Sequence, residues 1–349
     1  MQTRTLQATT EAIDTAAALL RAGELVVMPT ETVYGLAADA TQPRAVARIF
    51  AAKGRPADDP LIVHVATRSP TITALGPVCG DVSTPARRTA EALMSLWPGA
   101  LTIVLPRGPA VPPAVTSGLP FVALRCPAHP VAQALIRALG RPVVAPSANR
   151  FGRISPTTAE AAHHELSGNV PLILDAGPCQ IGVESTVLRV ESDGSTTLLR
   201  PGAVTADQIA ALTGRAPEAH TAGPKLSPGM MDSHYAPTTP LVLVDPHSSA
   251  DLRVLDAVRR RQPRAAWLAW SYLSASLHEH LGAIPTGLLA PDNTPDAGAR
   301  RLYGCLRDLD ASGAALIVCE RPPDASGLSA AILDRLRRAA ASTAPLSDL

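Results

Sequence analysis

A segment rich in proline and glycine, between residues 216 and 240, divides this 349-residue chain into two parts. Seven residues of the segment are proline or glycine, and it shows little apolar periodicity, which is typical of a linker. A single hydrophobic core rarely serves more than about 250 to 300 residues, so a chain of this length favours two domains. We therefore expect a first domain over residues 1–215, a linker over 216–240 and a second domain over 241–349.

The first part mixes helical and strand patterns without a regular alternation. Apolar spacing bounded by proline and glycine predicts an α/β domain with a mixed sheet and flanking helices. Helices are expected at 10–22, 43–52 and 130–139 and from 205 onward, and strands at 24–28, 61–65, 101–105, 121–125, 143–145, 172–174, 185–190 and 196–200.

Beyond the linker, strands and helices alternate cleanly. That rhythm predicts a smaller, Rossmann-like α/β domain with a parallel sheet. No Gly-x-Gly-x-x-Gly sequence follows its first strand, so a dinucleotide site is not supported there. Strands are expected at 241–244, 265–270 and 315–319, and helices at 249–260, 295–309 and 328–340.

The composition excludes several classes of protein. Apolar residues at 46% and charged residues at 17% indicate packed cores rather than disorder. A net charge of +1 and 3% aromatics argue against a general nucleic-acid platform. The five cysteines are scattered without a Cys-x-x-Cys pair, so neither a disulfide framework nor a structural zinc site is indicated. No run of eighteen apolar residues occurs, and we expect a soluble, cytoplasmic protein with no membrane contact.

Lys53 stands out because it and Lys225 are the only lysines among 31 basic residues. An ammonium is a compact charge often used against phosphate, whereas the arginine fork suits carboxylates. By position alone, a lysine in the last helical turn before Gly54 is equally well explained by the helix dipole. Lys53 also shares an apolar stripe with Val46 and Ile49, which is expected to face the protein. This phase favours a polyphosphate ligand.

Polar residues also stand at the ends of predicted strands. Ser147 and Asn149 follow an apolar strand, where small polar groups bind ligands in open α/β sheets, although an ordinary turn is the simpler interpretation. Arg125 ends a strand on the face opposite Leu124 and needs a carboxylate partner, from a ligand or a neighbour. His64 is first interpreted as a core histidine.

Other chemistries are not supported by the sequence. No glycine-lysine dipeptide or Gly-x-Ser-x-Gly elbow occurs, which argues against a Walker loop and a serine hydrolase. The runs 163–165 and 278–280 lack zinc-protease spacing and are expected to be solvated helix faces. Asp58 and Asp59 are expected to form a turn, with a supporting role near a metal as the alternative.

Seven short motifs stand out along the chain. They are Met-Pro-Thr-Glu-Thr-Val-Tyr-Gly-Leu at 28–36, Lys-Gly-Arg-Pro at 53–56, Pro-Leu-Ile-Val-His at 60–64, Trp-Pro-Gly-Ala-Leu-Thr at 97–102, Ala-Pro-Ser-Ala-Asn at 145–149, Ser-Pro-Gly-Met at 227–230 and His-Tyr-Ala-Pro at 234–237. The first five, in their order and spacing over residues 10–210, resemble the YrdC-like catalytic domain. The last two, followed by the small α/β region, are similar to the two-domain threonylcarbamoyl-AMP synthases.

The resemblance implies a nucleotidyltransferase. Members of this family make threonylcarbamoyl-adenylate from L-threonine, bicarbonate and ATP with release of pyrophosphate. The product supplies the group placed on the tRNA adenosine beside the anticodon. Mg²⁺ is expected with ATP and no dedicated protein metal site is expected. The implied partners are downstream tRNA-modifying transferases, with tRNA as a further contact.

The resemblance also assigns residues. It implies a catalytic role for Lys53 and Arg55. A carbamate is unstable in water, so the linker is expected to act as a lid. The residues implied to bind ATP are Lys53, Arg55, Asp59, Ser147, Asn149, Ser155, Arg200, His234 and Tyr235, and those implied to bind threonine are Thr32, His64, Arg125 and Ser185.

The chain departs from the family pattern at two places. Met231-Asp232-Ser233 replaces an expected basic pair before His234, which puts any phosphate contact from that pair in doubt. Phe151 replaces a small residue, a change expected to reshape its loop while leaving Ser147 and Asn149 in place.

Two alternatives stay open. One is a related carbamoyltransferase or hydrogenase-maturation protein with the same nucleotide-binding domain, but the maturation proteins carry zinc-finger cysteine pairs and this chain has none. The other is a double-stranded RNA-binding module, against which the near-neutral charge and few aromatics count.

Overall fold

The computed structural model describes residues 2–67, 71–220, 234–245, 247–249, 251, 253, 264–271 and 287–341. The chain splits into two compact units, and each is described by itself. Most of the expected linker and lid, most of the helix expected at 249–260 and the run 278–280 lie outside the described residues. The first unit comprises Met1–Phe151, Ser155–Gln180 and Glu184–Met230, and the second comprises Gly152–Ile154, Ile181–Val183 and Met231–Leu349.

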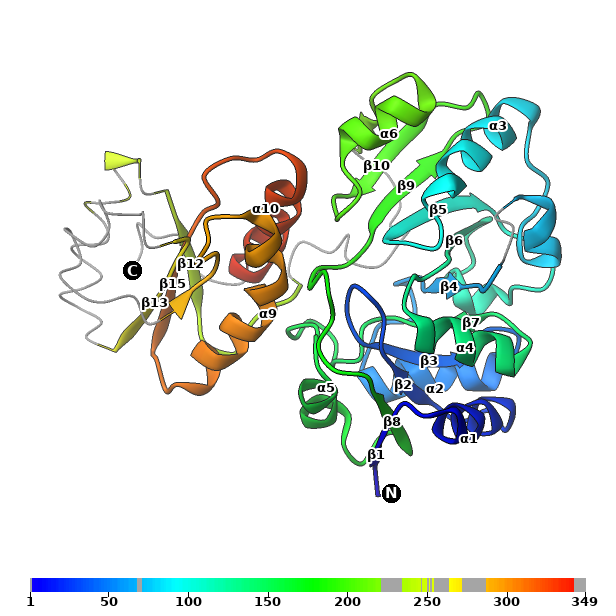
Figure 1. The fold of residues 1–349 in the computed structure, drawn as a ribbon, viewed down its shortest axis with the longest axis horizontal. Helices are drawn as coiled ribbons and strands as arrows, with labels where there is room; N and C mark the ends of the chain where they lie inside the picture. Colours follow the sequence, from blue (N-terminus) through cyan, green and yellow to red (C-terminus); the bar gives the residue numbers. More distant parts are fainter. Residues whose placement is uncertain are drawn as a thin grey trace. The chain divides into compact units, whose positions relative to one another are not determined.

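The first unit is built on one mixed sheet, as the sequence predicts (Figure 1). Its strand order is β1-β8-β2-β3-β7-β4-β6-β5-β9-β10-β11, with parallel and antiparallel neighbours. Strands that are neighbours in the sheet are thus often far apart in the chain. The strands are β1 (Arg4–Gln7), β2 (Val26–Met28), β3 (Gly35–Asp39), β4 (Ile62–His64), β5 (Leu101–Pro106), β6 (Phe121–Arg125), β7 (Val143–Val144), β8 (Leu172–Asp175), β9 (Thr186–Val190), β10 (Thr196–Arg200) and β11 (Glu218–Ala219).

Helices pack on both faces of this sheet. Strand residues alternate between the two faces, so Val26 and Met28 join one core while Val27 joins the other. Helices α1 and α4 lie side by side and contribute to the first core, whereas α2, α3, α5 and α6 contribute to the second (Figure 1). The helices are α1 (Thr10–Arg21), α2 (Pro43–Lys53), α3 (Thr84–Leu93), α4 (Pro130–Leu139), α5 (Ala159–Leu166) and α6 (Ala206–Thr213), with short 3₁₀ turns at Thr73–Val78, Met94–Leu96 and Pro113–Val115.

Helix α2 shows why local sequence predicts this element well. Pro43 occupies its first turn, and Gly54 ends it in the left-handed conformation at φ 62°, which L-residues with side chains rarely adopt. Val46, Ile49 and Lys53 are all buried. The predicted apolar stripe is therefore confirmed, and Lys53 lies on it.

The sequence did not predict β1, β3, β11 or α3, and of α5 it predicted only a helix face at 163–165. Strand β3 has the sequence Gly-Leu-Ala-Ala-Asp and is buried at every position, so it shows no alternation of apolar and polar residues. Strand β9 begins at Thr186 and not at the expected 185, so Ser185 lies just before the strand.

The second unit contains a small parallel sheet, as predicted, and its strand order is β12-β15-β13-β14. Gly182 also belongs to this unit, and its φ is 88°. A Cβ there would collide with the carbonyl oxygen of Ala299, so only glycine fits. Among the described residues, no helix has the length and apolar character needed to cross a membrane. The elements are β12 (Leu241–Val244), β13 (Ala265–Ala269), β14 (Gly287–Leu288), β15 (Leu316–Glu320), α9 (Pro295–Ala311) and α10 (Gly327–Ala340).

Candidate active site

The sheet of the first unit brings polar residues from four strands into one row. Strands β4 and β6 are parallel, and their last residues, His64 and Arg125, are direct neighbours. Strand β5 runs the other way, which places Thr102 opposite Arg125. Strand β9 follows β5 in parallel, and Ser185 precedes it. The ends of two strands and the starts of two others therefore meet at one place.

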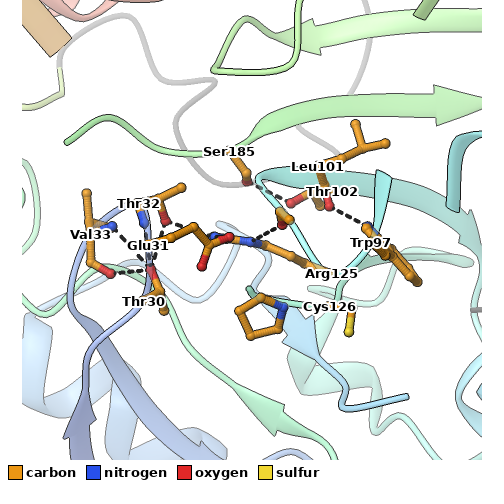
Figure 2. Close-up of polar contacts among 12 residues, drawn as sticks. Thr30, Glu31, Thr32, Val33, Trp97, Leu101, Thr102, Arg125, Cys126 and Ser185 are labelled. Atoms are coloured by element: carbon orange, nitrogen blue, oxygen red, sulfur yellow. Dashed lines mark hydrogen bonds and ion pairs between the residues drawn. The ribbon is translucent and has the colours of Figure 1, made fainter. Parts of the chain in front are cut away.

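Arg125 is the centre of this row. Its Nη1 donates to Thr32 Oγ1 at 2.9 Å, its Nε donates to the Gly99 carbonyl oxygen at 3.2 Å, and its Nη2 lies 2.6 Å from Glu31 Oε1. Figure 2 shows the carboxylate of Glu31 and the hydroxyl of Thr32 beside the guanidinium. The Thr32 hydroxyl is itself fixed by Thr30 Oγ1, 2.8 Å away. The carboxylate partner that the sequence required for Arg125 is thus a neighbour, Glu31.

Ser185 joins the row through Thr102. Their hydroxyl oxygens lie 2.7 Å apart (Figure 2). Arg200 donates to the Ser185 carbonyl oxygen through Nε at 3.1 Å and Nη2 at 3.0 Å, and Nη2 also lies 3.2 Å from Ser185 Oγ. Arg200, which we assigned to ATP, therefore directly holds a residue assigned to threonine.

Burial keeps His64 neutral. Only 2% of the residue is exposed, and Nδ1 lies 3.3 Å from the Ile62 carbonyl oxygen. This burial, together with the positive charge of Arg125, lowers the pKa of His64 from 6.5 to about 3, although Glu31 acts in the opposite direction. A neutral imidazole next to Arg125 adds no second positive charge to the row.

Stability should therefore depend on pH through His64. Because its pKa falls from 6.5 to about 3 on folding, the unfolded chain binds more protons between these values. The contribution is complete above pH 6.5 and is lost as pH falls toward 3, at about 1.4 kcal/mol per unit. Urea unfolding between pH 6 and 4.5 should show this extra slope in the wild type and not in His64→Gln. Equal slopes would contradict the prediction.

Lys53 lies in a second cluster, at the end of α2. Its Nζ donates to the backbone carbonyl oxygens of Ser147 and Asn149, and its own carbonyl oxygen accepts the Phe151 amide at 2.8 Å. The loop that carries Phe151 is therefore joined to the end of α2 by backbone contacts. Burial, followed by the positive charge of Arg55, holds the pKa of Lys53 well below its usual range, while Asp59 and Glu165 act in the opposite direction.

Arg55 and Asp59 form a buried ion pair beside this cluster. Arg55 Nη2 lies 2.9 Å from Asp59 Oδ2, and both side chains are at most 2% exposed. The guanidinium also donates to the carbonyl oxygens of Asp59 at 3.1 Å and Pro60 at 2.9 Å. The expected turn is present, because the Asp59 amide donates to the Pro56 carbonyl oxygen at 3.3 Å, and the Asp59 carboxylate in addition holds Arg55 in place.

One segment of chain connects the two clusters. Its first residues, including Thr32, contact Arg125, whereas Gly35 forms a bridge with Ser147 and the Ala148 amide donates to the Tyr34 carbonyl oxygen at 2.8 Å. The Arg125 row and the Lys53 cluster are thus joined by one short stretch of chain.

The three remaining residues that were assigned to ATP, Ser155, His234 and Tyr235, contact other groups. Ser155 Oγ donates to Glu184 Oε1 at 2.6 Å, and Glu184 directly precedes Ser185 in the chain. His234 and Tyr235 belong to the second unit, where the Tyr235 ring packs 5.8 Å from that of Tyr303. Their contact with ATP stays a prediction.

Sequence reasoning missed several polar residues of the site. Glu31 and Thr102 lie inside motifs that the sequence analysis recognised, and a charged residue in a mostly apolar motif was an available signal. Glu165 was expected on a solvated face, which is wrong. Its side chain is 3% exposed, and one carboxylate oxygen lies 3.2 Å from the Arg150 amide.

The oxygen-bearing side chains beside Lys53 are of a kind that Mg²⁺ accepts as ligands. Among the described residues, no group of three His, Cys, Asp or Glu side chains is arranged to hold a metal. Mg²⁺ typically keeps several waters and binds substrate phosphates with one or two protein oxygens. The side chains of Ser147 and Asn149 each carry an oxygen atom, which is the type of protein ligand that Mg²⁺ prefers.

Two family models match the chain. The Sua5, YciO and YrdC model, described as "Telomere recombination", matches residues 18–202. The model described as "Threonylcarbamoyl-AMP synthase, C-terminal domain" matches residues 204–341. The chain belongs to the threonylcarbamoyl-AMP synthase family.

Individual relatives agree with this family. A threonylcarbamoyl-AMP synthase of Bacillus subtilis is 49% identical over 66% of each chain, and that of Pyrococcus abyssi is 37% identical over 85% of each chain. The crystal structure of P. abyssi Sua5 complexed with L-threonine is 34% identical, covers 97% of both chains and has a TM-score of 0.83. The family resemblance inferred from the motifs is confirmed, and so is the two-part α/β fold.

Proposed function

We propose that this chain synthesises L-threonylcarbamoyl-adenylate from L-threonine, bicarbonate and ATP, with release of pyrophosphate. The observation that carries the proposal is the single segment that contacts Arg125 at one end and the Ser147 loop at the other. An arginine fork suits the carboxylate of an amino acid, and a lysine ammonium suits a polyphosphate. The two substrates would bind side by side.

The chemistry needs close placement more than a protein nucleophile. The threonine amine adds to the carbon of CO₂ with loss of a proton, or to that of bicarbonate with loss of water, to form a carbamate. A carbamate oxygen then attacks the α-phosphorus, and pyrophosphate leaves. Carbamate and triphosphate are both anions, so fixed cations are required to bring them together in line. Lys53 and Arg55 would neutralise the negative charge of the triphosphate, and Ser147 and Asn149 lie near Lys53. Mg²⁺ bound with ATP would supply further charge neutralisation.

The product is a mixed anhydride of a carbamate and a phosphate, which is an activated carbamoyl donor. Its consumers would be tRNA-modifying transferases in the cytoplasm that place the threonylcarbamoyl group on the adenosine beside the anticodon. Direct contact with tRNA is a further proposal. The threonine-bound structure of the P. abyssi relative supports the amino-acid substrate.

Pyrophosphate release tests the proposal. With ATP and Mg²⁺, release should require both L-threonine and bicarbonate, because the attacking carbamate contains atoms of both. Omission of either should reduce the rate to background. Release that is indifferent to threonine would contradict the proposal, and tight RNA binding in a filter assay without turnover would favour the RNA-binding alternative.

A further inference from the structure

Glu31 has a carboxylate oxygen that the fold leaves unused. The residue is 5% exposed, and Oε1 is paired with Arg125 at 2.6 Å. Oε2 is buried and accepts no hydrogen bond from any described residue. Most buried polar atoms in proteins are hydrogen-bonded, and an unpaired charged one is costly. The free oxygen therefore requires an explanation.

Arg125 has unused capacity beside it. Of the five N–H groups of a guanidinium, the contacts with Gly99, Thr32 and Glu31 use three. The adjacent His64 is neutral at physiological pH, because burial and Arg125 lower its pKa to about 3. Glu31 and Arg125 thus present one negative and one positive group side by side, each with hydrogen-bonding capacity for another partner.

This pair is the electrostatic complement of an amino acid. A free α-amino acid carries a carboxylate and an ammonium on the same carbon, so its two charges are also adjacent. The Arg125 fork matches the substrate carboxylate, and the free Glu31 oxygen matches an N–H of the amine. Because the protein pair is neutral as a whole, it suits a ligand whose own net charge is zero.

We propose that Glu31 binds the α-amino group of threonine while Arg125 binds its carboxylate, so that Glu31 selects amino acids over hydroxy acids. This inference rests on the proposed function. The same contact would orient the nitrogen that becomes carbamoylated. Thr32 and Ser185, which are also assigned to threonine, would then lie near the substrate side chain.

Glu31 is assigned to binding and not to proton removal. Burial alone would raise its pKa, but the charge and hydrogen bond of Arg125, with smaller effects of the nearby backbone of Glu31 and Ala128, hold it below the usual value of a carboxyl group. A carboxylate of this kind is a weak base toward an ammonium group. It is well suited to accept a hydrogen bond.

Two ligands separate the possible roles of Glu31. L-Threonine and 2,3-dihydroxybutyrate of matching stereochemistry differ only in the amino group. Calorimetric titration of the full-length chain should show that the wild type prefers threonine. In Glu31→Gln, threonine affinity should fall by about 10- to 100-fold, the usual range for loss of a hydrogen bond to a charged group. Affinity for the dihydroxy acid should change by less than about 3-fold, since its carboxylate still meets Arg125.

Asp39→Asn is the matched control. It neutralises another buried carboxylate of the same unit, which is paired with Arg141, and should leave the preference for threonine unchanged. ATP affinity and thermal unfolding of each variant report on folding.

Each outcome has a defined meaning. An equal loss of affinity for both ligands in Glu31→Gln would show that Glu31 acts only through Arg125, and would overturn the inference. Equal affinities of the wild type for the two ligands would overturn it even if the variant does not fold. Failure of the wild type to bind threonine at all would instead count against the proposed function.

Discussion

Replacement of Lys53 by alanine is expected to lower the turnover number by about 100- to 1,000-fold, the range seen when one preorganised donor is removed from a charged transition state. Lys53 is buried, and burial together with Arg55 holds its pKa well below the usual range. A bound polyphosphate would favour its charged form. Pyrophosphate release at saturating threonine and ATP measures the loss.

The Lys53 experiment needs controls for folding and for charge. Lys53→Gln keeps a donor for the Ser147 and Asn149 carbonyl oxygens without the charge, and should fold but remain slow. Arg44→Ala removes an exposed cation from the same helix and should have little effect. Lys225→Ala, in the expected linker, should also lose little. Equal losses in Lys53→Ala and Lys225→Ala would contradict the role given to Lys53.

Arg125→Lys is expected to raise the KM for threonine by about 100-fold while the KM for ATP stays within about 3-fold. Truncation of a buried, hydrogen-bonded charge pair costs about 2 to 5 kcal/mol, and lysine keeps the charge but lacks the planar fork. The contacts with Thr32 and Glu31 that aim the guanidinium would be lost. Initial rates at varied threonine and ATP separate the two effects.

Arg189→Lys is the matched control for Arg125→Lys. Arg189 lies on β9, in the same sheet, and its guanidinium is 4.4 Å from the centre of the Phe121 ring. It is not assigned to either substrate, so its replacement should leave the KM for threonine unchanged. A similar change in both variants, or a larger change in the KM for ATP, would contradict the placement of threonine at Arg125.

Strong local patterns predicted their elements well. Helix α2 has proline at its start, an apolar stripe and glycine at its end, and each signal acts within a few residues. In β6, Leu124 and Ala123 do enter different cores, as the alternation predicted. Strand β3 lacks such a pattern, because both of its faces are buried and its residues are mostly small. Its place in the sheet comes from pairing with β2 and β7.

The motifs identified the residue types of the site but not their partners. Glu31 and Arg125 are 94 positions apart, and so are Lys53 and Ser147. Sheet register and loop packing bring these groups together, so no local pattern contains the information. The expectation that Glu165 lies on a solvated face was wrong for the same reason, because its partner Arg150 comes from another segment.

The sequence by itself determined the two-part organisation, the parallel sheet of the second unit, the family and the residues that carry its motifs. These depend on composition and on spacing within short stretches of chain. The tertiary structure alone decided which charges are buried, that Asp59 holds Arg55 and that Glu31 keeps one free oxygen beside Arg125. The physical reason is that desolvation and ion pairing depend on neighbours in space, and those neighbours are set by the packing of distant strands.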